Sequence, residues 1–136
     1  MFLEERGAAG CEGTGMLAGV RGPDVESITR FVAPDQEAGT HPSSWVEVTR
    51  AGKVQLAIGL DQGERWLARI HSHPGQAFHS PVDDDNPGLT ADGAVSIVVP
   101  FFGLGLRRGL ESCALYERIN GRWTRRSIDD LCIELT

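Results

Sequence analysis

An apolar segment over residues 66–71 runs directly into the sequence His71-Ser72-His73-Pro74. Alternate side chains of a β-strand share a face, so the two imidazoles point together while Ser72 points away. Two imidazoles at the end of a strand can hold a zinc ion. A His-x-His pair alone is more often two histidines without a metal, so other residues must decide between these interpretations.

Several further segments have the alternation or β-branched content of strands, and glycine and proline occur often between them. Residues 15–20 and 25–32 are predicted to pair across a turn at 21–24, and the run at 95–100 is predicted as a central strand. The Asn120-Gly121 dipeptide predicts a hairpin between strands at 112–119 and 122–127. These segments predict five to seven strands with one or two helices, which is a mixed α/β (α+β) layer.

Residues 45–60 fit two patterns. Ala51, Val54, Ala57 and Ile58 have helical spacing, whereas Val54, Leu56, Ile58 and Leu60 alternate as in a strand. Periodicity alone therefore leaves this segment undecided between a helix and a strand.

The charge and the cysteine pattern exclude several classes of function. The net charge of −6, from 19 acidic and 13 basic residues, gives no electrostatic attraction to nucleic acid. Cys11, Cys113 and Cys132 are odd in number and widely spaced, which predicts reduced thiols in a cytoplasmic protein. The first residues lack the pattern of a secretory signal, and the apolar stretch over 94–106 is too short to cross a membrane.

Two more groups of residues accompany the histidine pair. Ser80 and Asp83 form Ser-x-x-Asp after it, and Glu12 begins Glu-x-x-Gly-x-Leu-x-Gly far upstream. Together these motifs resemble the JAMM metalloproteases of the JAB1/MPN family, whose signature is a distant Glu, then His-Ser/Thr-His-Pro, then Ser-x-x-Asp. The resemblance implies a JAB1/MPN-like mixed β-sheet flanked by one or two helices, over residues 1–136 as a single domain. It also favours a helix within 45–60.

The resemblance also implies a role for each motif residue. His71, His73 and Asp83 would bind one zinc ion, whose fourth ligand is the catalytic water. Glu12 would be the general base that carries a proton from this water to the leaving amine, and Ser80 would donate a hydrogen bond to the oxyanion.

The chain departs from the family pattern in two places. The loop over residues 74–79 is one residue shorter than in the eukaryotic signature, and only eleven residues precede Glu12, where the family usually has a long helix. We therefore expect a shortened N-terminal helix. Asp84 or Asp85 would replace Asp83 as a ligand if the register differs, although capping of a short helix is the commoner role for such residues.

Three other features have a functional and a structural interpretation. His79 could line the substrate groove or bind a second metal, but loop histidines usually have no such role. Cys11 adjoins Glu12, and its default is a neutral buried thiol. The apolar residues 101–106 could grip an extended substrate or a partner, or they could form strand and core loop.

The compact length and the form of the motif resemble the stand-alone bacterial JAB proteins of operons for ubiquitin-like conjugation. Several such operons act in antiphage defence, and they also encode activating and conjugating enzymes. The expected function is a zinc-dependent isopeptidase that cleaves after the C-terminus of a ubiquitin-like protein. The alternatives are a hydrolase that releases an amino acid from a sulfur-carrier protein in cysteine biosynthesis, or a non-catalytic MPN scaffold.

Overall fold

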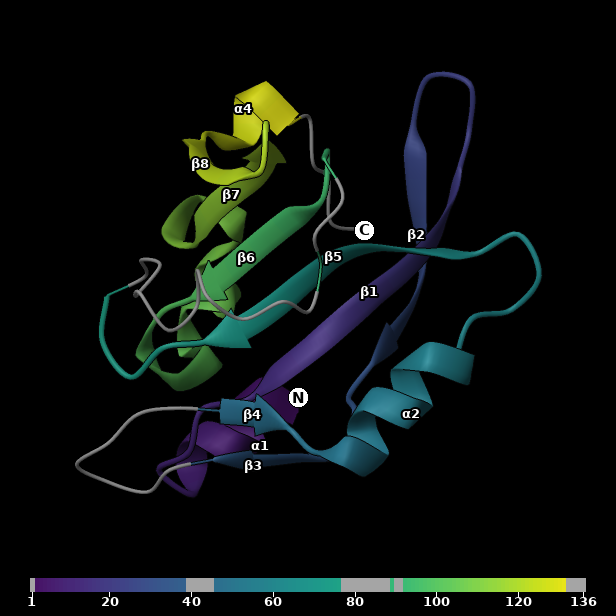
Figure 1. Ribbon diagram of the computed structural model, residues 1–136. Helices are drawn as coiled ribbons and strands as arrows, with labels where there is room; N and C mark the ends of the chain where they lie inside the picture. The colour runs from purple at the N-terminus through teal and green to yellow at the C-terminus, as the bar shows by residue number, and fades with distance from the viewer. Residues whose placement is uncertain (1, 39–45, 77–88, 90–91, 132–136) are drawn as a thin grey trace.

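The computed structural model describes residues 2–38, 46–76, 89 and 92–131. Within these residues, six strands form one sheet in the order β2-β1-β5-β6-β7-β8 (Figure 1). The strands are β1 Thr14–Arg21, β2 Glu26–Val32, β5 Arg65–Ser72, β6 Val95–Val99, β7 Ala114–Ile119 and β8 Arg122–Arg126. Strands β5 and β6 are parallel and all other neighbours are antiparallel, so the sheet is mixed as predicted.

The predicted hairpins are present with small shifts of their ends. Strands β1 and β2 pair across residues 22–25, where the Gly22 N–H donates to the Val25 carbonyl at 2.8 Å. Asn120 and Gly121 connect β7 to β8, and both have a positive φ, as a two-residue hairpin turn of this sequence requires. Strand β7 begins two residues later than predicted because residues 110–112 form a 3-10 turn.

The segment over residues 45–60 contains the helix that the resemblance favours, so the alternative strand through Val54 and Ile58 is wrong. Within its described part, β4 spans Val46–Val48 and α2 spans Arg50–Ile58. The Thr49 hydroxyl accepts a hydrogen bond from the Gly52 N–H at 3.1 Å and so caps the helix. This cap marks where the strand ends and the helix begins. Strand β4 pairs with β3, Gln36–Ala38, in a second, two-stranded sheet that the sequence patterns did not predict.

A short helix precedes Glu12, as expected. Helix α1 spans Phe2–Ala8, and α4, Ile128–Leu131, follows the last strand. In the part of the chain that the structure describes, no helix is long and apolar enough to cross a membrane. The short helix considered at Asp83–Asp85 lies outside the described residues.

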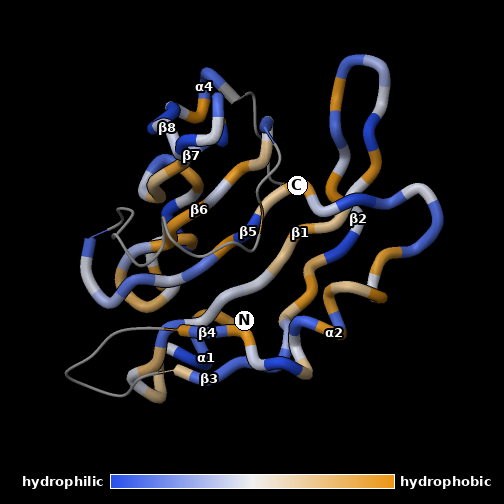
Figure 2. The backbone as a smooth tube through the Cα atoms, viewed as in Figure 1, coloured by the Kyte–Doolittle hydropathy of each residue, from blue (hydrophilic) through white to orange (hydrophobic). Residues whose placement is uncertain are grey.

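The core joins α1 to one face of the central strands. Its buried members are Leu3, Ile70, Ile97, Val99, Leu110, Cys113 and Leu115. Figure 2 shows mainly apolar residues along β6, which crosses this core, and mainly polar residues along β8 at the edge. Leu3 comes from α1, so burial of this side chain holds α1 against the sheet.

We expect Leu3→Ala to lower the free energy of unfolding by about 2–5 kcal/mol, because truncation leaves a cavity in the core. Urea unfolding measures this change. Leu104→Ala is the control, since Leu104 is exposed and its truncation should cost about 0.5 kcal/mol or less. Equal losses in the two variants would mean that α1 is not held by Leu3.

Residues 101–106 differ from the expected strand and core loop. They belong to a kinked 3-10 segment, η1, Phe101–Arg108, which follows β6 and contacts α1. Phe101 and Phe102 have φ values of 55° and 53°, in the left-handed region that aromatic residues rarely adopt. Their N–H groups donate to the carbonyls of Gly75 at 2.9 Å and His73 at 2.7 Å. These bonds tie η1 to the residues that follow β5.

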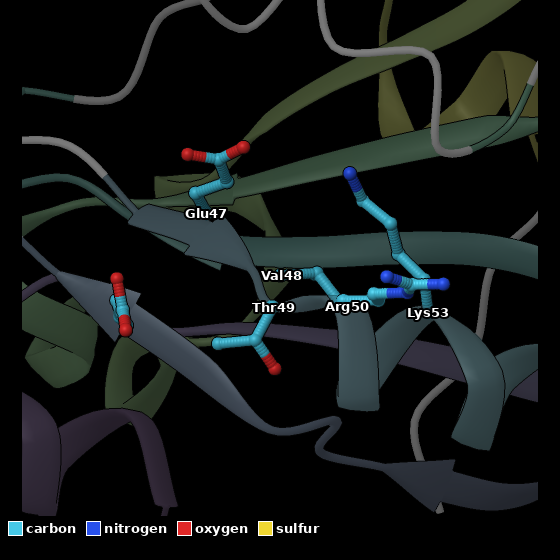
Figure 3. Close-up of a pocket in the computed structure, with 6 residues that line it drawn as sticks. Glu47, Val48, Thr49, Arg50 and Lys53 are labelled. Atoms are coloured by element: carbon cyan, nitrogen blue, oxygen red, sulfur yellow. The ribbon is translucent and has the colours of Figure 1, made fainter.

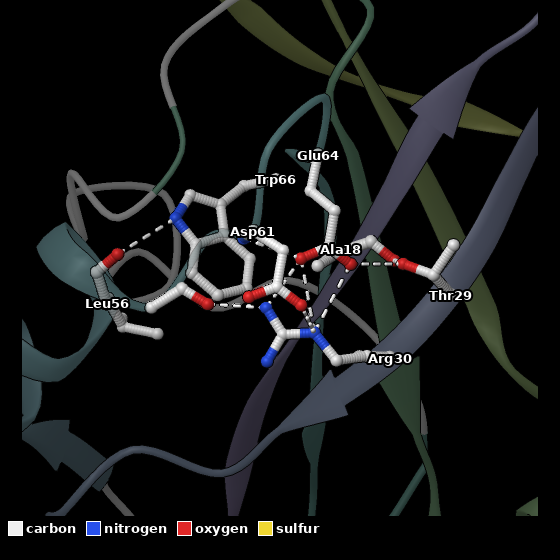
Figure 4. A network of polar contacts seen from close by, with 8 residues as sticks. Ala18, Thr29, Arg30, Leu56, Asp61, Glu64 and Trp66 are labelled. Carbon is white, nitrogen blue, oxygen red and sulfur yellow. Dashed lines mark hydrogen bonds and ion pairs between the residues drawn. The ribbon is translucent and has the colours of Figure 1, made fainter.

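A polar network joins β2 to the start of β5 (Figure 4). Arg30 forms an ion pair with Glu64 at 2.6 Å, and Glu64 also accepts hydrogen bonds from the Thr29 hydroxyl and the Asp61 N–H. The hydrogen bond from Arg30, followed by that from Thr29, lowers the pKa of Glu64 to about 2. The network therefore stabilises the ionised carboxylate of Glu64.

A carboxyl whose pKa is lowered by folding stabilises the fold above its unfolded pKa, and this stabilisation is lost as the pH falls toward the folded pKa. For Glu64 this stabilisation is lost as the pH falls from 4.5 to about 2. We expect the wild type to be more stable than Glu64→Gln at pH 6 and the difference to shrink below pH 4.5. Urea midpoints measured across this range test the expectation. A difference that does not vary with pH would contradict it.

Candidate functional site

The candidate site lies where the start of β1 meets the end of β5. These strands are antiparallel, and Thr14 is opposite His71. The Ser72 N–H donates to the Gly13 carbonyl at 2.9 Å, so the pairing extends one residue beyond Thr14. Continued by one further residue, this register would set Glu12 opposite His73.

Directly opposed residues of an antiparallel pair project to the same face, with Cβ atoms about 4.5–5.5 Å apart. Side chains two residues apart on one strand also share a face. Thr14 and His71 therefore lie on one face of the sheet, and alternation continued beyond the strand ends would place Glu12 and His73 on the same face. The chain separates Glu12 from the histidines by 58 residues or more, and strand pairing brings them together.

The two imidazoles lie close together in a buried position. Their ring centroids are 5.9 Å apart with an angle of 52° between the planes. His71 is 4% exposed, His73 is 9% exposed and Glu12 is 5% exposed. The His73 N–H donates to the Val99 carbonyl at 2.8 Å, which fixes His73 against β6. The arrangement offers nitrogen donors and a carboxylate on a face shielded from bulk water.

The backbone around Glu12 is held by α1. The Arg6 Nε donates to the Glu12 carbonyl at 3.3 Å, and the Cys11 N–H donates to the Arg6 carbonyl at 3.0 Å. Gly13 is tightly enclosed, since a Cβ at this position would lie 3.1 Å from the Leu3 side chain and 3.2 Å from that of Arg6. The segment between α1 and β1 thus fixes where the Glu12 side chain begins.

Gln36 is a supporting residue that sequence reasoning missed. Its side-chain amide accepts a hydrogen bond from the Thr14 N–H and donates one to the Thr14 carbonyl, both at 2.8 Å. The amide therefore acts as a strand partner for β1 next to the candidate site. No motif marks this glutamine, because its role depends on the position of β3.

Arg69 was also missed, although it lies two residues before His71 on the same face of β5. This arginine is buried, its Nε donates to the Ser96 hydroxyl at 3.0 Å, and its guanidinium carbon lies 4.9 Å from the ring centroid of Trp123. Alternation along β5 places Arg69 on the histidine face, but nothing in the local sequence indicates that a charged side chain is buried there.

The remaining predicted site residues lie outside the described part of the chain. These are Ser80 and Asp83, together with the weaker candidates His79, Asp84 and Asp85. Among residues 2–38, 46–76, 89 and 92–131, no group of three His, Cys, Asp or Glu side chains is arranged to hold a metal. The assignment of Asp83 as the third ligand, and of Ser80 as the oxyanion donor, stays a prediction.

The two described cysteines have different environments, and Cys11 is not the buried thiol that was expected. Cys11 is only half-buried, and its thiol lies 3.7 Å from the Ala9 carbonyl oxygen. Cys113 is buried in the core, and desolvation raises the pKa of its thiol to about 11. Cys113 is therefore a neutral core thiol at physiological pH.

A separate open pocket of about 470 Å³ lies between the β3–β4 pair and α2 (Figure 3). It is lined by Glu37, Glu47, Val48, Thr49, Arg50 and Lys53. Glu37 and Glu47 are directly opposed in the strand register, and the basic residues come from α2. The pocket contains none of the four residues on the candidate site face.

Comparison with known proteins identifies a related sequence and a related fold. The chain is 36% identical, over 102 residues or 74% of its length, to the "Probable metalloprotease y4jG" of Sinorhizobium fredii (strain NBRC 101917 / NGR234). The match covers 63% of that relative, so the chain spans less than two thirds of its length. No family model matches the chain.

A related fold is found in the solution structure of protein DSY2949 from Desulfitobacterium hafniense. Its TM-score is 0.59 at 18% identity, and the alignment covers 93% of this chain and 83% of that one. The likeness shows a shared fold. The chain thus has a distant homologue named as a probable metalloprotease.

Proposed function

We propose that this chain is a zinc-dependent peptidase of the JAMM type. The observation that supports the proposal is the β1–β5 register, which pairs Thr14 with His71 and, continued to the next residues, would set the buried Glu12 opposite His73. A carboxylate beside two imidazoles is the combination that hydrolytic zinc sites use. The similarity to a probable metalloprotease supports the same chemistry.

The donor set fits zinc. His71 and His73 supply imidazole nitrogens from one strand face, and Asp83 would supply a carboxylate oxygen, which leaves one of four tetrahedral positions open. When bound, zinc would acidify a water molecule and polarise the substrate carbonyl. Both imidazoles are largely removed from bulk solvent.

The proposed role of Glu12 is proton transfer. Its carboxylate takes the proton that leaves the attacking water and gives it to the departing amine, which could not leave as an anion. A buried carboxylate held by strand pairing needs little reorganisation for this task. Ser80 would donate a hydrogen bond to the oxygen on which negative charge develops.

The proposed substrate is the C-terminal region of a bacterial ubiquitin-like protein, cleaved to process a precursor or to reverse a conjugate. The resemblance to stand-alone bacterial JAB proteins supports this substrate class, as well as activating and conjugating enzymes as partners and a role in antiphage defence. Release of an amino acid from a sulfur-carrier protein would use the same residues, so the two substrates need to be compared directly.

The test uses ubiquitin-like and sulfur-carrier proteins encoded near this chain's gene, each with a C-terminal extension. The wild type is assayed with zinc and with a chelator, and products are identified by mass. Zinc-dependent cleavage after the ubiquitin-like C-terminus supports the proposal, and faster cleavage of the carrier protein would favour the alternative substrate. Cleavage of neither by zinc-loaded protein would favour the scaffold and contradict the proposal.

A further inference from the structure

Ser72 lies between the two histidines, yet its side chain has a different environment. It is fully buried, and by alternation it projects to the face opposite the imidazoles. Its hydroxyl oxygen accepts a hydrogen bond from the Gly13 N–H at 2.9 Å. Its own N–H donates to the Gly13 carbonyl, also at 2.9 Å. One residue thus binds both backbone polar groups of the residue after Glu12.

This pairing differs from an ordinary antiparallel ladder. There, two opposed residues exchange N–H to carbonyl bonds in both directions. Here the second bond ends on the Ser72 side chain. The contact is therefore sensitive to the residue type at position 72, which a backbone ladder would not be. Alanine would leave the buried Gly13 N–H without this acceptor.

We infer that Ser72 is a positioning residue that sets Glu12 relative to the two imidazoles. The inference rests on the proposed function, because Ser72 would affect catalysis through the proton transfer assigned to Glu12. The chain of contacts is short, because Ser72 is bonded covalently to His71 and His73 and by hydrogen bonds to the neighbour of Glu12. Small errors in such geometry slow catalysis without weakening substrate binding.

The test compares Ser72→Ala, Ser72→Thr and the matched control Ser96→Ala. Ser96 is also fully buried, but its hydroxyl accepts from Arg69 on the neighbouring strand. Amide hydrogen exchange of Gly13, relative to that of Ile97 in β6, reports on the hydrogen bond without any substrate. Zinc content, kcat and KM report on the site.

For Ser72→Ala we expect Gly13 exchange to accelerate about tenfold relative to Ile97, and kcat to fall by about tenfold or more, with KM and zinc content unchanged. Ser72→Thr keeps the hydroxyl and should restore both the protection and kcat. Ser96→Ala should leave Gly13 exchange at the wild-type value.

Three outcomes would overturn the inference. One is unchanged Gly13 exchange in Ser72→Ala, and another is faster exchange with a wild-type kcat. Loss of zinc from Ser72→Ala would also overturn it, because the hydroxyl would then support the metal ligands. If the wild type cleaves neither substrate, the proposed function fails, whereas faster Gly13 exchange would still support the link between the strands.

Discussion

Glu12→Gln is expected to lower kcat by about 10²–10⁴-fold while leaving the zinc content unchanged. Glutamine has nearly the same shape as glutamate, so the packing around this buried position is kept. It has no carboxylate to accept a proton, and the leaving amine therefore lacks its proton donor. Single-turnover cleavage of the C-terminally extended substrate measures the rate, and metal analysis of the purified protein measures zinc.

Glu5→Gln is the matched control, since Glu5 lies in α1 close in sequence but is exposed. It should cleave at the wild-type rate. A Glu12→Gln variant that retains activity would place the proton acceptor elsewhere. Loss of zinc from this variant would make Glu12 a metal ligand. Glu12, His71 and His73 would then have to be considered together as the ligands.

The sequence predicted the strands that carry the site because their patterns are local. Alternation over residues 66–73 is enough to put His71 and His73 on one face, and their rings lie 5.9 Å apart. The small residues after Glu12 predicted β1, and its pairing with β2 was predicted from the turn between them. What local patterns cannot supply is the β1–β5 register, since strand pairing between distant segments depends on the whole sheet.

The features that sequence reasoning missed all depend on tertiary contacts. Gln36 acts as a strand partner only because β3 reaches Thr14, and the hydroxyl of Ser72 gains its role only when β1 lies beside β5. The left-handed backbone at Phe101 and Phe102 opposes the preference of these residues, and the carbonyls of Gly75 and His73 hold it in place.

The segment around Thr49 shows a different limit. Helical and alternating spacing both fit residues 45–60, so counting apolar positions cannot separate them. The hydroxyl that caps α2 divides the segment into a strand and a helix. A threonine followed by Arg-Ala-Gly is a weak cap signal in sequence, and the two competing periodicities share Val54 and Ile58, both of which lie in α2.

His73→Ala and Asp83→Ala are each expected to remove bound zinc and, with it, essentially all cleavage. A site with three protein ligands that loses one binds metal far more weakly, and the catalytic water then lacks its activation. Zinc content after dialysis and the cleavage rate measure the two effects. His73→Ala should stay folded, because His73 is not a member of the apolar core cluster among the described residues.

His79→Ala and Asp84→Ala are the matched controls, since each makes the same substitution beside the motif. They should keep zinc and activity if Ser80 and Asp83 are aligned as the family signature implies. Zinc lost from Asp84→Ala but kept in Asp83→Ala would move the third ligand by one residue, which the shorter loop over residues 74–79 would then explain. Zinc kept in His73→Ala would contradict the metal site itself, because no alternative imidazole lies beside His71 on β5.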